Sequence, residues 1–164
     1  MLLNLEKSGV PMKRIYLLSE ELKNDPEQIA LAQALTMNTS RPTLGLKGTY
    51  GLFGSHEWWE NIEQHKIPLL FVSGIVLRVY IAGQDGYENN TVDLLMEDGS
   101  VRDAGIYVND NRDIPLVRVG CRVELVYVLD ELKKQPAPNG GVNYSKIALE
   151  MAVSSQPVET LSAR

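Results

Sequence analysis

Apolar and polar residues alternate along five segments from Ile67 onward, which is the pattern of half-buried β-strands. In the first segment Ile75, Leu77 and Val79 fall on one side, and Gly74 marks a point where a strand can bend. The five predicted strands are Phe71 to Ala82, Thr91 to Glu97, Val101 to Val108, Val119 to Val128 and Tyr144 to Val153.

The shortest connection between two of these strands contains Asp98-Gly99. A type I′ turn needs positive φ at both central residues, and Asp-Gly is one of the few pairs that adopt this conformation readily. The sequence therefore predicts a tight hairpin at this point.

The first half of the chain is predicted to be mainly helical after a short strand at Arg14 to Leu18. Asp25 and Gln28 flank Pro26 in the pattern of a capped helix start, with Asp25 as the N-cap. We expect this helix to run to about Met37 and to pack one face on the sheet.

A second, short helix is predicted to begin after Ser55. Trp58 and Ile62 are four residues apart and share a face of this helix. Trp59, by contrast, cannot point into the same core, so one of the two tryptophans is a candidate for binding a ligand or a partner.

Between the two helices, Gly45, Gly48, Gly51 and Gly54 recur at every third position. We interpret the Gly45 to Gly54 segment as an extended backbone that packs closely on aromatic neighbours. Its free backbone N–H groups before the next helix also suit an anion such as phosphate, and the sequence leaves both interpretations open.

These elements predict an α+β fold. The five strands from Ile67 to Ser155 resemble an OB-fold, a small five-stranded β-barrel, in their order and in the tight hairpin between the second and third strands. The resemblance departs at Asn109 to Leu116, which is too short for the usual helix and contains Pro115. An SH3-like barrel and an open α+β sandwich are the alternatives.

The predicted domain is a single one, residues 12–155, with a helical and glycine-rich part (12–66) and an OB-like barrel (67–155) on which the N-terminal strand and the two helices pack. The length of the whole chain, 164 residues, fits one core. We expect residues 1–11 to be a disordered extension and residues 156–164 to be a frayed tail.

The composition excludes some kinds of site and indicates a cellular compartment. A single cysteine, Cys121, excludes an internal disulfide and a multi-cysteine zinc site. The sequence contains neither an apolar run long enough for a membrane span nor the pattern of a signal peptide, so we expect a cytoplasmic protein without a membrane segment.

The net charge of −5 has its origin in residues 71–110, which by themselves carry −5. The binding residues predicted there lie on the hairpin: Asp93, Glu97, Asp98 and Asp103. Such a surface repels phosphates and attracts cations. We therefore predict a non-enzymatic binding module whose partner is another protein with a basic surface, as in an inhibitor or immunity-type protein.

Two other functions are retained as alternatives. One is an OB-like binder of single-stranded nucleic acid that uses basic residues of the last third of the chain. The other is a small-molecule-binding protein with a pocket near Trp58. A homodimer is also predicted as possible, through exposed edges of the strands Val119 to Leu129 and Tyr144 to Val153.

No enzymatic function, metal or cofactor is predicted. His56-Glu57-Trp58-Trp59-Glu60 resembles the zinc-binding H-E-x-x-H pattern, but Glu60 stands where the second histidine is required. Cys121 lies in an alternating strand, where a small packed side chain is the expected role.

Overall fold

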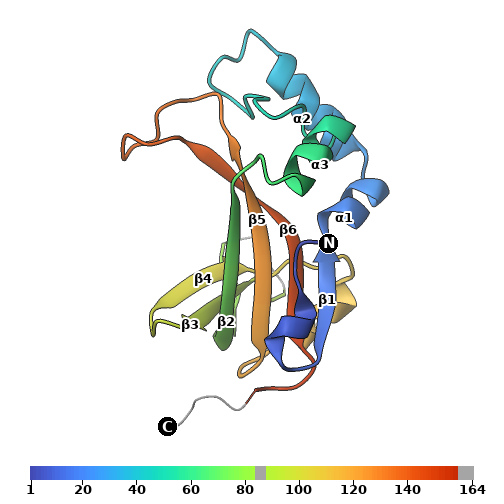
Figure 1. Ribbon diagram of the computed structural model, residues 1–164, viewed down its shortest axis with the longest axis vertical. Coiled ribbons are helices and arrows are strands. Elements are labelled where there is room, and N and C mark those ends of the chain that lie inside the picture. The colour runs from blue at the N-terminus through green and yellow to red at the C-terminus, as the bar shows by residue number, and fades with distance from the viewer. Residues whose placement is uncertain (84–87, 159–164) are drawn as a thin grey trace. The chain divides into compact units, whose positions relative to one another are not determined.

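The computed structural model describes residues 1–83 and 88–158 (Figure 1). Its six strands form one sheet in the order β1-β6-β5-β2-β3-β4, and the pairs β1 with β6, β2 with β3, and β3 with β4 are antiparallel. The strands are β1 (Met12–Leu17), β2 (Leu69–Tyr80), β3 (Thr91–Met96), β4 (Val101–Gly105), β5 (Arg122–Glu131) and β6 (Tyr144–Ser154).

The sheet is open, with β1 and β4 as its edge strands. The mixed α+β class and the positions of the predicted strands are confirmed, whereas the sheet does not close into the predicted barrel. β5 and β6 are interior strands with a neighbour on each side. The prediction that these two strands expose an edge is therefore wrong, because β1 and β2 occupy their outer sides.

The hairpin between β3 and β4 is confirmed, but its turn is of another type. Gly99 has a φ of 87°, whereas Asp98 is not among the described residues with positive φ. The backbone N–H of Gly99 donates to the carbonyl of Met96 at 3.0 Å, and that of Met96 donates to Ser100 at 2.8 Å. A three-residue loop that ends in a left-handed glycine explains this pattern without a type I′ turn.

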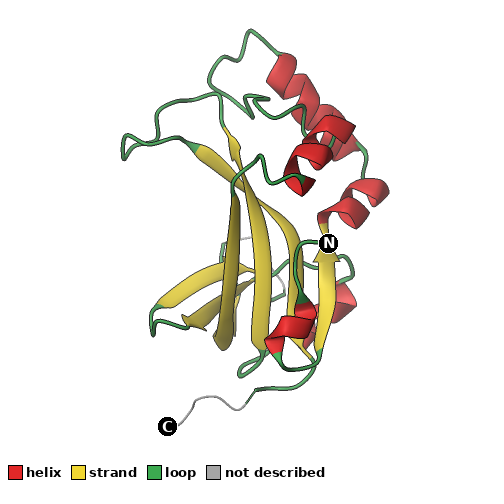
Figure 2. Ribbon diagram, in the orientation of Figure 1, coloured by secondary structure: helices red, strands yellow, loops and turns green. Residues whose placement is uncertain are grey.

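Residues 1–83 and 88–158 contain three α-helices, one of which was not predicted. Figure 2 shows the helices in red. α1 (Leu18–Asn24) follows β1 directly and buries Leu18 and Leu22, which are four residues apart. α2 (Glu27–Met37) has the predicted extent, but Pro26 is its N-cap residue and the side chain of Asp25 accepts from Gln28 instead of capping the backbone.

Contrary to the prediction that α2 packs one face on the sheet, this helix contains no fully buried residue. Its Leu35 and Ile29 approach Gly45 and Gly54, where an added Cβ would lie 2.8 and 3.1 Å from their side-chain carbons. Gln33 also donates to the carbonyl of Phe53 at 2.9 Å. α2 therefore packs on the glycine segment.

The glycine segment is a series of turns instead of an extended backbone. The φ angles of Gly45, Gly48, Gly51 and Gly54 lie between 75° and 101°, a region that favours glycine. The segment packs closely as predicted, but α2 supplies the aliphatic Leu35 and Ile29 at Gly45 and Gly54 instead of the predicted aromatic neighbours. α3 (His56–Glu63) follows, and its predicted N-cap is confirmed, because Ser55 Oγ accepts from the Trp58 N–H at 3.2 Å.

The N-terminal segment lies against β6. The backbone N–H groups of Leu2 and Leu3 donate to the carboxylate of Glu150 at 2.6 and 3.0 Å. Arg14 on β1 donates to the Leu3 carbonyl at 2.8 Å. A 3-10 helix, η1 (Leu5–Ser8), completes the segment, and a second, η2 (Asn111–Leu116), occupies the stretch that was judged too short for a helix.

The chain divides into two compact units, and three strands contribute residues to both. Unit 1 comprises Met1–Leu18, Phe71–Val126 and Ala148–Arg164, and unit 2 comprises Ser19–Leu70 and Tyr127–Ile147. The boundaries between the two units fall within β2, β5 and β6, and the single domain expected from the sequence, with its parts 12–66 and 67–155, stays a prediction. Buried apolar residues of β2, β3, β5 and β6 form the core of unit 1, among them Val76, Leu94, Val123 and Met151.

Candidate protein-binding face

Three neighbouring strands of unit 1 expose one of their faces. Ile75 on β2 is opposite Leu95 on β3, and Leu95 is opposite Val101 on β4. Residues opposite each other in an antiparallel pair point to the same side of the sheet, so these three side chains share a face. We call the side of β2, β3 and β4 that carries them the open face.

The apolar part of the open face is largely uncovered. Phe71, Leu77 and Val101 have 54%, 44% and 59% of their surface exposed, and Ile75 and Leu95 are half-buried. The opposite side of β2 carries Val72 and Val76, which are at most 2% exposed. Because β2 is apolar on both sides, its alternation alone did not tell which side faces the core.

A β-bulge changes the composition of the face along β2. The register shifts between Val76 and Arg78, so that Arg78 is opposite Asp93 and Tyr80 is opposite Thr91. Val79 is thereby opposite the buried Val92. The predicted single side containing Ile75, Leu77 and Val79 is therefore divided by the bulge.

Two of the predicted acidic residues lie on the open face. Asp93 and Asp103 are directly opposite each other on β3 and β4. Asp93 is partly neutralised, since Arg78 Nε lies 3.8 Å from its Oδ2 and the Tyr80 hydroxyl donates to its Oδ1 at 3.0 Å. Asp103 is exposed and has no ion pair with any residue in the described ranges, so it presents its charge to solvent.

The other two predicted acidic residues lie at the hairpin turn. Both Glu97 and Asp98 are exposed. Asp98 accepts hydrogen bonds from the backbone N–H and hydroxyl of Ser100, and these bonds lower the pKa of its carboxyl. Asp98 is thus a turn-forming residue that remains ionised, while Glu97 forms no ion pair within the described part of the chain.

The other described acidic residues of the segment, Glu88 and Asp110, lie outside β2, β3 and β4. Arg112 forms hydrogen bonds with both oxygens of Asp110, and this contact lowers the pKa of Asp110 to about 2. Glu88 is exposed on the loop after β2, and Asp85 lies outside the described residues. The charge available to a partner is therefore concentrated at Glu97, Asp98 and Asp103.

A hollow of about 500 Å³ indents the open face next to the hairpin turn. Its walls include Ile75, Leu95, Met96 and Glu97, and Arg122 of β5 also lines it. None of the six residues predicted as binding residues, apart from Glu97, lines this hollow. It was not predicted because residues from three separate stretches of sequence, 73–75, 95–99 and Arg122, meet there.

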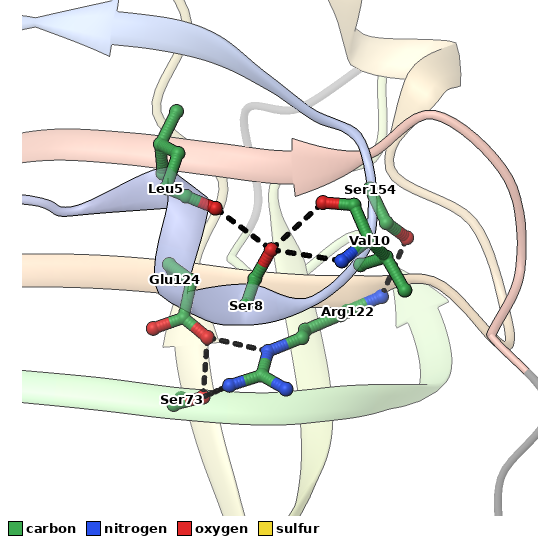
Figure 3. Close-up of polar contacts among 7 residues, drawn as sticks. All are labelled: Leu5, Ser8, Val10, Ser73, Arg122, Glu124 and Ser154. Carbon is green, nitrogen blue, oxygen red and sulfur yellow. Dashed lines mark hydrogen bonds and ion pairs between the residues drawn. The ribbon is translucent and has the colours of Figure 1, made fainter.

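Arg122, which lines the hollow, is held in position by polar contacts with Glu124 and Ser73 (Figure 3). Its Nε donates to Glu124 Oε2 at 2.6 Å, and its Nη2 donates to Ser73 Oγ at 3.3 Å. Ser73 in turn donates to the same Glu124 oxygen at 2.6 Å. Figure 3 shows the three side chains directed toward one another from β2 and β5.

The tryptophans lie in unit 2. Trp58 has no exposed surface, and its Nε1 donates to Oδ2 of the buried Asp130 at 2.9 Å. Trp59 is partly exposed and packs edge-on against Trp58, with ring centroids 5.0 Å apart. Trp58 is therefore a packing residue, as its spacing with Ile62 indicates, and Trp59 is the one that reaches solvent.

The residues considered for catalysis show ordinary surface or core environments. His56 Nε2 lies 3.3 Å from Glu60 Oε2 on α3, where the histidine side chain is 95% exposed. Cys121 is fully buried. In residues 1–83 and 88–158 no group of three or more His, Cys, Asp and Glu side chains is arranged to hold a metal ion.

A family model described as Immunity protein RhsI2 matches residues 12–154 of the chain. The chain belongs to this immunity protein family. The match extends from the start of β1 to the end of β6 and so includes every strand of the sheet. No curated protein matches the chain.

Family membership supports the prediction of an immunity-type binding module over the alternatives. The family match and the open face are independent observations, because the open face is defined by the pairing of β2, β3 and β4. Among the described residues, no helix combines the length and apolar character needed to cross a membrane.

Proposed function

We propose that this chain is a non-enzymatic immunity protein that neutralises a toxin by binding it through the open face of β2, β3 and β4. The observation that carries this proposal is the family match over residues 12–154. An immunity protein protects by acting on another protein, so the relevant feature of this chain is a surface and not a catalytic centre.

The composition of the open face supports its role as that surface. Protein interfaces combine an apolar centre with a polar rim. Here Phe71, Leu77 and Val101 supply exposed apolar area, and Asp103 and Glu97 supply unpaired negative charge beside it. A toxin surface with apolar residues surrounded by Lys and Arg is complementary to this arrangement.

The charge also indicates how the complex forms. Complementary charges raise the association rate of two proteins and select against partners with the same sign. A toxin that acts on nucleic acid or nucleotides has a basic active site, and an acidic face of an immunity protein can cover it. Single-stranded nucleic acid is a less suitable ligand, because Asp93 and Asp103 lie opposite each other on this face.

Growth protection tests the proposal. Cells that express the cognate toxin are expected to stop growing, and co-expression of the chain is expected to restore growth. The substitution His56→Ala is expected to protect as well as the unchanged chain, because the exposed His56 has no role in a binding mechanism.

Two results would contradict the proposal. One is cell death in the presence of the folded chain, together with no complex on size-exclusion chromatography. The other is protection by amounts of chain far below those of the toxin, which indicates catalytic removal of the toxin or its product. Loss of protection in His56→Ala would support that second outcome.

A further inference from the structure

The hollow on the open face has the features of an anchor site. Interfaces concentrate their binding energy in a few large side chains that enter well-packed pockets near the centre of the contact. At about 500 Å³ the hollow has room for one aromatic side chain. It is also continuous with the exposed apolar residues, because Ile75 and Leu95, two of its walls, are in register with Val101.

The walls of the hollow favour an aromatic group over an aliphatic one. Ile75 and Leu95 offer apolar contact to a ring. The guanidinium of Arg122 offers a planar cation that attracts a ring face. Because Glu124 and Ser73 already hold this guanidinium, little side-chain entropy is lost when a ring packs on it.

The rim of the hollow favours a positively charged group on the partner. Glu97 is exposed, lines the hollow and has no ion-pair partner within the described ranges. Arg122, in contrast, is paired with Glu124. A residue of the partner beside the aromatic ring therefore adds most to the affinity if it is a Lys or Arg that pairs with Glu97.

We propose that the hollow is the anchor site of the toxin interface and receives one aromatic side chain of the toxin, while a neighbouring Lys or Arg of the toxin pairs with Glu97. This proposal rests on the proposed function. It adds the chemistry of the partner's contact point and assigns Ile75, Glu97 and Arg122 as residues that determine specificity.

Titration calorimetry with the purified toxin tests the anchor site. Ile75→Lys places a charged chain in the hollow and is expected to weaken binding about 100-fold, the loss typical of a central interface residue. Glu97→Lys reverses the rim charge and is expected to weaken binding about 10-fold. Val119→Lys is the matched control, since Val119 is 61% exposed and lies off the open face, and its affinity is expected to be unchanged.

A double-mutant cycle identifies the occupant. Each exposed aromatic residue of the toxin is replaced by alanine and titrated against the unchanged chain and against Ile75→Lys. For one aromatic residue the two substitutions together are expected to weaken binding no more than either alone, because both remove the same contact. Circular dichroism and the thermal midpoint establish that each variant is folded. If Ile75→Lys does not fold, the cycle is repeated with Glu97→Lys, because Glu97 lies on an exposed turn where a substitution leaves the fold intact.

The possible outcomes separate the two proposals. If the unchanged chain does not bind the toxin, both fail. If it binds and the folded variants Ile75→Lys and Glu97→Lys bind equally well, the anchor site is wrong and the immunity function stands. If sedimentation shows that the unchanged chain is a dimer that Glu97→Lys dissociates, a second copy occupies the hollow and the anchor proposal is overturned.

Discussion

Trp58 and Asp130 form a buried polar contact in unit 2. Neither residue has exposed surface. Asp130 Oδ2 accepts from Trp58, and its Oδ1 has no hydrogen-bond partner within the described part of the chain. Burial raises the pKa of Asp130, and the hydrogen bond from Trp58 offsets only part of this effect.

The raised pKa of Asp130 predicts a pH dependence of stability. The folded chain keeps the Asp130 proton to higher pH than the unfolded chain, in which the pKa is near its ordinary 3.8. Protonated Asp130 therefore adds to the free energy of unfolding. This stabilisation is fully present below pH 3.8 and is lost as the pH rises through the pKa of Asp130 in the folded chain. Asp130→Asn is expected to remove this loss and to be about 1 kcal/mol more stable than the unchanged chain at pH 7.

Urea unfolding between pH 3.5 and 7 measures this difference. The stability advantage of Asp130→Asn is expected to grow with pH. Trp58→Phe is the matched control, because it leaves the buried carboxylate without its donor and is expected to cost about 2 kcal/mol at pH 7. An advantage of Asp130→Asn that is absent at pH 7 or constant with pH would contradict the assignment of a raised pKa.

The sequence predicted one half of this contact. The four-residue spacing of Trp58 and Ile62 placed both on one helix face, and the structure buries both. Asp130 was not predicted, because it lies 72 positions from Trp58 and follows an apolar strand whose pattern gives no sign of a polar partner.

Glu150 attaches the N-terminal segment to the sheet, and this contact was not predicted. The carboxylate side chain is 7% exposed, binds the N–H groups of Leu2 and Leu3, and lies 3.5 Å from Arg14 Nε. In the sequence Glu150 interrupts an otherwise apolar strand. A buried acid at such a position implies a partner, but the sequence does not reveal that the first residues of the chain supply it.

Removal of the Glu150 carboxylate is expected to destabilise this segment. Glu150→Ala leaves Arg14 without its ion pair and two backbone N–H groups without an acceptor, and is expected to cost about 3 kcal/mol. Glu150→Gln keeps an acceptor oxygen and is expected to cost less. Hydrogen exchange measures the effect directly, since the Leu2 and Leu3 amides should exchange faster in Glu150→Ala, and unchanged exchange rates would contradict this role.

Strands and helices were easier to predict than the way they pair. Alternation located β2 to β6 within a few residues, because a period of two is local information. The β2 bulge, the two-sided apolar character of β2 and the pairing of β1 with β6 depend on neighbours distant in sequence. For that reason the strands were predicted and the open sheet was not.

At the scale of the whole chain, charge and family membership indicate the same kind of function. The charge of residues 71–110 predicted a protein-binding module of the immunity type, and the chain belongs to an immunity protein family. The detailed face differs from the prediction, since Asp93 is partly neutralised by Arg78 and the exposed apolar residues beside it were not recognised.

Carboxyl footprinting of the complex with the toxin tests the open face most directly. Carbodiimide labelling followed by mass spectrometry reports the accessibility of each acidic side chain. On addition of toxin, the labelling of Glu97 and Asp103 is expected to fall severalfold, while Glu27 and Glu63, which are exposed in unit 2, remain unchanged. A stable complex in which Glu27 or Glu63 is protected and both Glu97 and Asp103 remain fully labelled would contradict the proposal that toxin binds the open face.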